Sequence, residues 1–149
     1  MKYLGIDPGK TGALAVIDDQ SFYTYVVDMP ETPSDLADEL EAMRDETYGL
    51  TAAIEKQQAM PGQGVSSTFQ TGYGYGLLIG TLASLSIPFV EVRASKWKSS
   101  MGLQGKDKSE SRKLAQSLFP AAELHRVRDH GRAEALLLAV WLQREERRA

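Results

Sequence analysis

The chain has 149 residues, of which 42% are hydrophobic and 25% charged, a length and balance typical of one globular domain spanning 1–149. It contains no cysteine, which excludes disulfides, Cys-ligated zinc and iron–sulfur clusters. The formal net charge of −3 hides an uneven distribution: residues 1–92 hold 4 basic and 13 acidic side chains, whereas residues 93–149 hold 13 basic and 7 acidic ones. Because phosphate binding requires only a local basic face, the acidic total does not exclude a nucleic-acid partner.

The sequence contains no run of apolar residues long enough to span a bilayer. Met1 leads directly into a strand-like segment, where a secretory leader would have a basic and then an apolar stretch. We therefore expect a cytoplasmic protein without a membrane partner.

The first part of the chain predicts a three-stranded antiparallel meander. Residues 3–6 and 11–17 are apolar, strand-like runs joined by Asp7-Pro8-Gly9-Lys10, whose Pro-Gly centre is typical of a turn. A third strand is expected at about 21–27. An acidic helix follows, opening at Pro33-Ser34-Asp35 and running to about Arg44.

The rest of the chain alternates strands with helices. The expected elements are a buried strand at 51–55, a flexible stretch at 57–66, a long helix from Ser66 or Ser67 to about Leu85, a strand at 88–92, a basic segment at 93–113, and helices at about 109–118 and 131–147. This order indicates an α/β fold with a mixed sheet, whose first three strands are antiparallel, flanked by helices.

Three acidic residues stand where such a fold would bring them together. Asp7 ends the first strand, Glu55 ends the fourth, and Glu134 lies in the first turns of the last helix. Carboxylates that close repel one another unless a cation neutralises them, and all-oxygen sites suit Mg²⁺ or Mn²⁺. Two such ions about 3.5–4 Å apart clamp the attacking and leaving oxygens of phosphodiester hydrolysis. A solvated charge or a helix cap is the alternative for each, although Glu134 interrupts the apolar run 133–142, where a charge needs a partner.

Two residues beside Glu134 extend this hypothesis. His130 lies four residues earlier, on the same helix face, and is either a fourth metal ligand or acid–base group or else a surface histidine. Asp129 is either the N-cap of the helix or, if the helix begins late, the fourth ligand in place of His130.

The basic segment 93–113 has two interpretations. It is either a solvated charged surface or a phosphate-contacting surface in which Trp97 is interleaved among basic residues. The candidate DNA-binding residues are Lys96, Lys98, Lys106, Lys108, Arg112 and Lys113.

Glycines recur every fourth residue in the long helix. Gly72, Gly76 and Gly80 share one face, which predicts close packing of that face against the sheet or against a second subunit.

Taken in order, these motifs resemble those of RuvC-type Holliday junction resolvases, in the compact form of phage members. The resemblance covers nearly the whole chain. It is carried by Gly5-Ile6-Asp7-Pro8-Gly9, Ile54-Glu55-Lys56, Pro61-Gly62-Gln63-Gly64-Val65-Ser66-Ser67, Gly102-Leu103-Gln104-Gly105-Lys106-Asp107-Lys108 and Ala133-Glu134-Ala135-Leu136.

The resemblance implies an RNase H-like fold and a metal-dependent endodeoxyribonuclease of a bacterial or phage-infected cell. Such an enzyme is a homodimer that resolves four-way DNA junctions by symmetric nicks near the branch point. The alternatives are a flap or fork nuclease, an RNA-processing nuclease on the same fold, and a non-catalytic junction-binding protein.

The resemblance also implies roles for individual residues. Asp7, Glu55 and Glu134 would bind Mg²⁺ or Mn²⁺, as two ions, with His130 or Asp129 as the fourth ligand. Lys108, and in addition Lys98, would match the lysines that contact the scissile region. The expected catalytic residues are therefore Asp7, Glu55, Glu134, His130 and Lys108.

Overall fold

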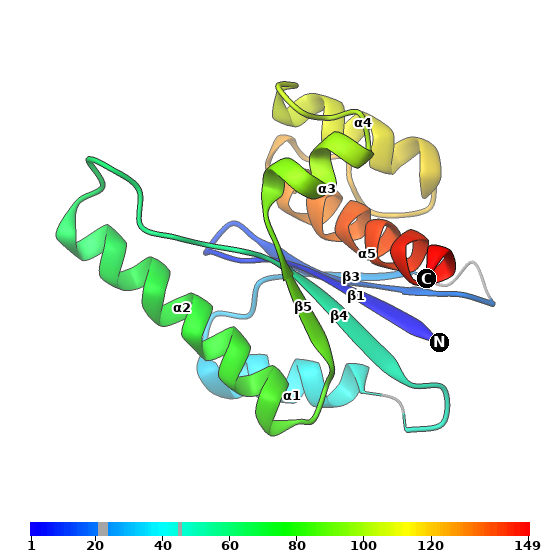
Figure 1. Ribbon diagram of the computed structural model, residues 1–149, viewed down its shortest axis with the longest axis horizontal. Coiled ribbons are helices and arrows are strands. Elements are labelled where there is room, and N and C mark those ends of the chain that lie inside the picture. Colours follow the sequence, from blue (N-terminus) through cyan, green and yellow to red (C-terminus); the bar gives the residue numbers. More distant parts are fainter. Residues whose placement is uncertain (21–23, 45) are drawn as a thin grey trace.

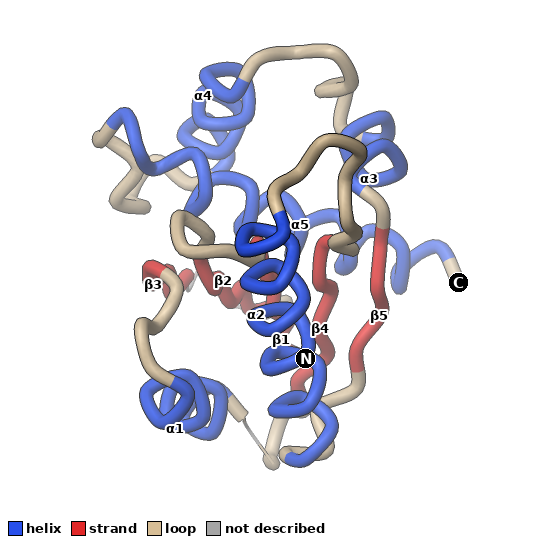
Figure 2. The backbone as a smooth tube through the Cα atoms, turned by 90° about the vertical axis from the view of Figure 1, so that its left-hand side faces the viewer, coloured by secondary structure: helices blue, strands red, loops and turns tan. Residues whose placement is uncertain are grey.

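The computed structural model describes residues 1–20, 24–44 and 46–149. Within this part of the chain, five strands form one sheet in the order β3-β2-β1-β4-β5, which can be followed across Figure 2. The strands are β1 (Lys2–Asp7), β2 (Ala13–Asp18), β3 (Thr24–Asp28), β4 (Leu50–Glu55) and β5 (Phe89–Val92). β1, β2 and β3 pair antiparallel, whereas β4 runs parallel to both β1 and β5. The predicted mixed sheet with an antiparallel first half is confirmed.

The third strand is described from Thr24 onward, and the beginning of the segment predicted for it, residues 21–23, lies outside the described residues.

Helices cover both faces of the sheet (Figure 1). They are α1 (Pro33–Met43), α2 (Val65–Ser84), α3 (Ala94–Ser100), α4 (Lys108–Leu118) and α5 (His130–Arg148), with a short 3₁₀ turn at Val127–Asp129 before α5. Figure 1 shows α1 and α2 on one side and α3, α4 and α5 on the other. The short helix α3 lies within the segment 93–113, which the sequence analysis identifies as basic without predicting a helix at this position.

The two-residue period of the strands decides which side chains meet which helices. On β1, Leu4 and Ile6 belong to the core beneath α1 and α2, whereas Tyr3 belongs to the core beneath α5. Asp7 has the same parity as Tyr3 and therefore lies on the α5 side. The same alternation in β4 places Glu55 on that side as well, because Ala53 belongs to the α5 core.

The backbone of α5 lies directly against β1 and the turn that follows it. A Cβ atom built on Gly5 would stand 1.9 Å from the carbonyl oxygen of Ala135, and one built on Gly131 would stand 2.2 Å from that of Thr11. Only glycine allows so close an approach without movement of the backbone. These two contacts set the height of α5 above the sheet and thereby the position of Glu134.

The helices of the described chain include none whose length and apolar character would let it cross a membrane.

Candidate metal and nucleic-acid site

Three carboxylates from three separate elements converge above the C-terminal ends of β1 and β4. Each of Asp7, Glu55 and Glu134 offers an oxygen, and these oxygens all lie within 4.8 Å of one another. The convergence follows from the register: β1 and β4 are parallel neighbours that pair through Ile6 and Ile54, so the next residue of each strand stands beside the other. The third carboxylate comes down from α5. The juxtaposition expected from the sequence is therefore present.

The electrostatics of this cluster favour a bound cation. Burial, together with the negative charges of Glu134 and Glu55, raises the pKa of Asp7 from 3.8 to about 8. The positive charges of Lys98 and Lys108 act in the opposite direction but do not cancel the effect. A hard divalent cation is the partner that clustered carboxylate oxygens suit, and it would relieve both the desolvation and the repulsion. The donor set therefore fits Mg²⁺ or Mn²⁺.

The raised pKa of Asp7 predicts how the stability of the metal-free protein depends on pH. Between about pH 4 and about 8 the folded protein keeps a proton on Asp7 that the unfolded chain has lost. The free energy of unfolding should therefore fall as the pH rises through this window. Calorimetry in EDTA should show a falling melting temperature for the wild type and a flatter profile for Asp7→Asn. Equal slopes for the two proteins would contradict this prediction.

The short helix α3 supplies side chains to two of the three carboxylates. The indole Nε1–H of Trp97 donates a hydrogen bond of 2.8 Å to Oε2 of Glu55. The adjacent Lys98 forms an ion pair of 3.0 Å with Oε1 of Glu134. Glu134 thus has the partner that its position in an apolar run requires. Burial raises the pKa of Glu55, and the hydrogen bond from Trp97 opposes this rise.

The place of Trp97 corrects one part of the sequence interpretation. As an aromatic residue interleaved with lysines, it was expected in a phosphate-contacting surface, yet its exposed fraction is 0%. Because α3 turns this ring inward onto the core beneath α5, it cannot stack on a nucleic-acid base. The sequence does not predict the hydrogen bond of this ring to Glu55.

Two of the six predicted basic residues act on the carboxylates through their charge. Lys98 contacts Glu134 directly, and Lys108, the first residue of α4, is close enough for its charge to lower the pKa of Asp7. These are the two lysines that the resemblance associates with the scissile region.

The other four basic candidates lie in different surroundings. Lys106 is exposed in the loop between α3 and α4. The ammonium of Lys96 lies 6.0 Å from the centroid of an indole ring of α5. Arg112 donates a 2.9 Å hydrogen bond to a backbone carbonyl between α4 and α5, and Lys113 forms a 3.3 Å ion pair with a glutamate one turn earlier in α4. Their assignment to DNA binding stays a prediction.

Asp129, one of the two candidates for a fourth ligand, is engaged elsewhere. Its carboxylate is buried and accepts hydrogen bonds of 2.8 Å and 2.7 Å from the backbone N–H and Nε of Arg126. Both Arg126 and Arg132 also pair with Asp28 at the end of β3. Burial alone would raise the pKa of Asp129, but the hydrogen bonds and charge of Arg126 outweigh it and lower that pKa. Asp129 therefore fastens the start of α5 to the edge of the sheet.

His130, the other candidate, is the half-buried first residue of α5. It stands one helical turn before Glu134, as its spacing predicts, but it does not belong to the group of donors within 4.8 Å of one another. A role for His130 as a ligand or acid–base group stays a prediction.

Replacing Asp129 separates its two suggested roles. Asp129→Asn should lower the free energy of unfolding of the metal-free protein by about 1.5–3 kcal/mol, the range for hydrogen bonds to charged groups. Urea denaturation in EDTA measures this loss. Asp28→Asn is the matched control, because Asp28 accepts from the same arginines at a more exposed position, and its loss should be smaller. Unchanged stability with weakened Mn²⁺ binding would instead identify Asp129 as a metal ligand.

Comparison with known proteins finds a similar protein by sequence and similar folds among solved structures. No family model matches the chain. Over 95 residues, 62% of this chain, it is 33% identical to a protein named Holliday junction resolvase MOC1, chloroplastic, from Chlamydomonas reinhardtii. The matched region amounts to 11% of that protein, so the chain spans only a small part of its relative.

The structural similarity extends over almost the whole molecule. The chain superposes on RuvC from Thermus thermophilus with a TM-score of 0.67 and 18% sequence identity, covering 99% of this chain and 96% of RuvC. The same values hold for the T. thermophilus RuvC structure determined in complex with a Holliday junction substrate. The chain therefore has the RuvC fold, the RNase H-like arrangement that its motifs predicted.

Proposed function

We propose that this chain is a divalent-metal-dependent endodeoxyribonuclease that resolves four-way DNA junctions by paired nicks near the branch point. The observation that carries the proposal is the cluster of Asp7, Glu55 and Glu134, whose oxygens lie within 4.8 Å of one another on a RuvC fold. The names of the similar proteins, a Holliday junction resolvase and a RuvC bound to a junction, support the choice of substrate. A single sheet with its two cores supports one nuclease domain over 1–149.

In this proposal the three carboxylates hold Mg²⁺ or Mn²⁺ beside the scissile phosphate. Bound as one or two ions, the metal supplies Lewis-acid stabilisation of the phosphate and lowers the pKa of a water molecule. The chain itself holds Asp7 and Glu55 at fixed strand ends and Glu134 on a helix wedged against β1. His130, one turn before Glu134, is the candidate for a fourth ligand or for the group that handles the proton of the attacking water.

The distribution of charge supports a DNA-binding surface on the same side. α3, α4 and α5 come from the basic part of the chain and lie on the face that carries the carboxylates (Figure 1). The acidic helix α1 packs on the opposite face and so lies away from the proposed substrate. Lys98 and Lys108, next to the carboxylates, are placed to contact phosphate oxygens, and the remaining basic candidates would extend the contact along the DNA.

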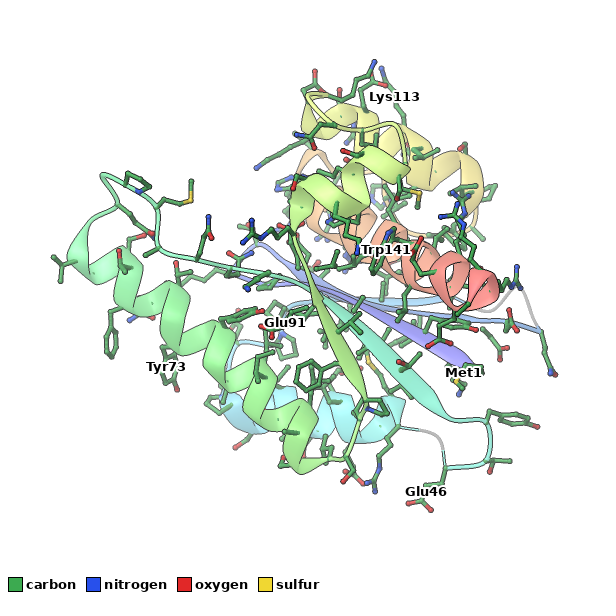
Figure 3. The ribbon with its side chains drawn as sticks, in the orientation of Figure 1. Met1, Glu46, Tyr73, Glu91, Lys113 and Trp141 are labelled. Carbon is green, nitrogen blue, oxygen red and sulfur yellow. The ribbon has the colours of Figure 1, made fainter. Side chains whose placement is uncertain are left out.

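A homodimer is the second part of the proposal, because paired symmetric nicks require two sites related by a two-fold axis. The outer face of α2 supports it. Val65, Phe69 and Tyr73 are 89%, 69% and 54% exposed, and Figure 3 shows Tyr73 projecting from α2 away from the sheet. Cβ atoms built on the glycines at 72, 76 and 80 would meet nothing within 4 Å, so this face does not pack on the sheet, and the second subunit is the remaining expected partner.

Cleavage assays with end-labelled substrates test the proposal. We expect the protein with Mg²⁺ or Mn²⁺ to nick four-way junctions in two strands of like polarity, with little action on linear duplex and none in EDTA. Binding should weaken steeply with salt, and sedimentation should give twice the mass of the chain. If the protein cleaved flaps, forks or RNA in preference to four-way junctions, the proposed substrate would be wrong. If it bound junctions but cleaved no branched DNA, the protein would be a junction-binding protein and not a nuclease.

A further inference from the structure

One short helix restrains two of the three carboxylates through neighbouring residues. On α3, Trp97 hydrogen bonds to Glu55 and Lys98 pairs with Glu134. The two contacts differ in kind. Lys98 is positively charged, so a metal ion would compete with it for Glu134. The indole N–H of Trp97 is neutral and can only donate a hydrogen bond. The indole contact therefore orients Glu55 without adding a positive charge that would oppose a bound cation.

The surroundings of Trp97 keep its N–H in a fixed direction. The residue is fully buried, in the core beneath α5 with residues of β1, β4 and α5. Its backbone carbonyl accepts a 2.8 Å hydrogen bond from the hydroxyl of Ser100, which helps to hold the end of α3 in place. A ring so enclosed cannot change its rotamer without disturbing the core. Its donor therefore acts as a rigid support.

The geometry of Glu55 makes such a support useful. Glu55 is the last residue of β4, and the hydrogen bond from Trp97 engages its Oε2 atom. Anchoring that oxygen restricts rotation of the carboxylate and keeps its other oxygen available to the cluster. Groups that orient metal ligands in this way contribute about 10–100-fold in metal affinity or activity.

We propose that Trp97 is a positioning residue, whose indole N–H holds the Glu55 carboxylate in the orientation that binds the divalent cation. The inference rests on the proposed metal site, but not on the nature of the DNA substrate. It assigns to Trp97 a role beyond filling the core. This role predicts that loss of the indole N–H lowers the affinity of the protein for the metal ion.

The chain offers a matched control in its second tryptophan. Trp141 is buried in the same core and stands seven residues, or about two turns, beyond Glu134 on α5. Figure 3 shows it on α5. Trp97→Phe and Trp141→Phe therefore remove the same atoms from the same core, and only the first removes a donor to a carboxylate of the cluster.

Calorimetric titration with Mn²⁺ in the absence of DNA measures the effect. We expect Trp97→Phe to weaken Mn²⁺ binding about 10–100-fold and Trp141→Phe to leave it within about twofold of the wild type. Equal affinities for all three proteins, or equal losses in the two variants, would overturn the positioning role. If the wild type binds Mn²⁺ but cuts no junction, the proposed substrate is wrong and this inference still holds. If the wild type binds no Mn²⁺, both the proposed function and this inference are wrong.

A second measurement applies even if Trp97→Phe does not fold. In ¹H–¹⁵N spectra of the unaltered protein the two tryptophans give two indole signals, which the Trp141→Phe variant assigns. We expect Mg²⁺ to shift the Trp97 signal and leave that of Trp141 in place, and Glu55→Ala to shift the Trp97 signal in the same selective way. A Trp97 signal that responds to neither change would refute the inference.

Discussion

Replacement of Asp7 by asparagine is expected to slow junction cleavage by about a thousandfold or more, which corresponds to about 4 kcal/mol of transition-state stabilisation. The side chain keeps its size and loses its charge, so the cluster holds two carboxylates in place of three and binds the cation weakly. Junction binding in EDTA should persist, because the pKa of about 8 leaves Asp7 largely protonated near neutral pH in the metal-free protein, so the substitution removes little charge there. Single-turnover cleavage and gel-shift titration measure the two effects separately.

Asp38→Asn provides the matched control for this experiment. It makes the same chemical change, at an exposed position of α1 on the opposite face of the sheet. Its cleavage rate should equal that of the wild type. An Asp7→Asn protein that cleaves junctions at the wild-type rate would contradict the assignment of the metal site, whatever the control does.

Much of the fold could be predicted because its elements have strong local signals. The Pro-Gly turn after Asp7 and the apolar runs on either side define β1 and β2, and the three helices α1, α2 and α5 are long enough to show their boundaries within a few residues. α3 was missed because seven residues make barely two turns, too few for a helical period to emerge from a stretch of lysines and serines. Its inward-facing Trp97 was missed with it.

The candidate site was predictable in its main members and not in its supports. Asp7 and Glu55 end parallel neighbouring strands on the same face, so topology alone brings them together. The partners of Glu134 and Glu55 depend on how α3 packs, which no spacing along the chain reveals. The choice between Asp129 and His130 depended on where α5 begins. A shift of one residue in a helix start rotates a side chain by about 100°, and the structure turns Asp129 toward Arg126 and away from the carboxylates.

The glycines show the same division between local and tertiary information. The regular spacing in α2 suggested close packing, yet Gly76 faces open space, whereas Gly5 carries no periodic signal and lies against the backbone of α5. The contact at Gly5 joins residues 130 positions apart in the sequence and depends on the final arrangement of sheet and helix.

Gly5→Ala is accordingly expected to be strongly destabilising, because the added methyl group has no room between β1 and α5. The new Cβ would stand 1.9 Å from the carbonyl oxygen of Ala135 and 2.7 Å from the amide nitrogen of Ala139. Both are backbone atoms of α5, so no rotamer change relieves the overlap, and the helix must move off the sheet. We expect a loss of about 3 kcal/mol or more in the free energy of unfolding, at or beyond the upper end for overpacked cores. Urea denaturation measures it.

The same displacement should disable the site, because Glu134 immediately precedes Ala135 and moves with it. Mn²⁺ affinity should therefore fall in whatever fraction of Gly5→Ala remains folded. Gly74→Ala is the control: it adds the same methyl group inside α2, where nothing lies within 4 Å, and should raise stability by about 0.5–1 kcal/mol through helix propensity. If Gly5→Ala had the stability and the Mn²⁺ affinity of the wild type, the close packing of α5 on β1 would be contradicted. The position of Glu134, which depends on that packing, would be contradicted with it.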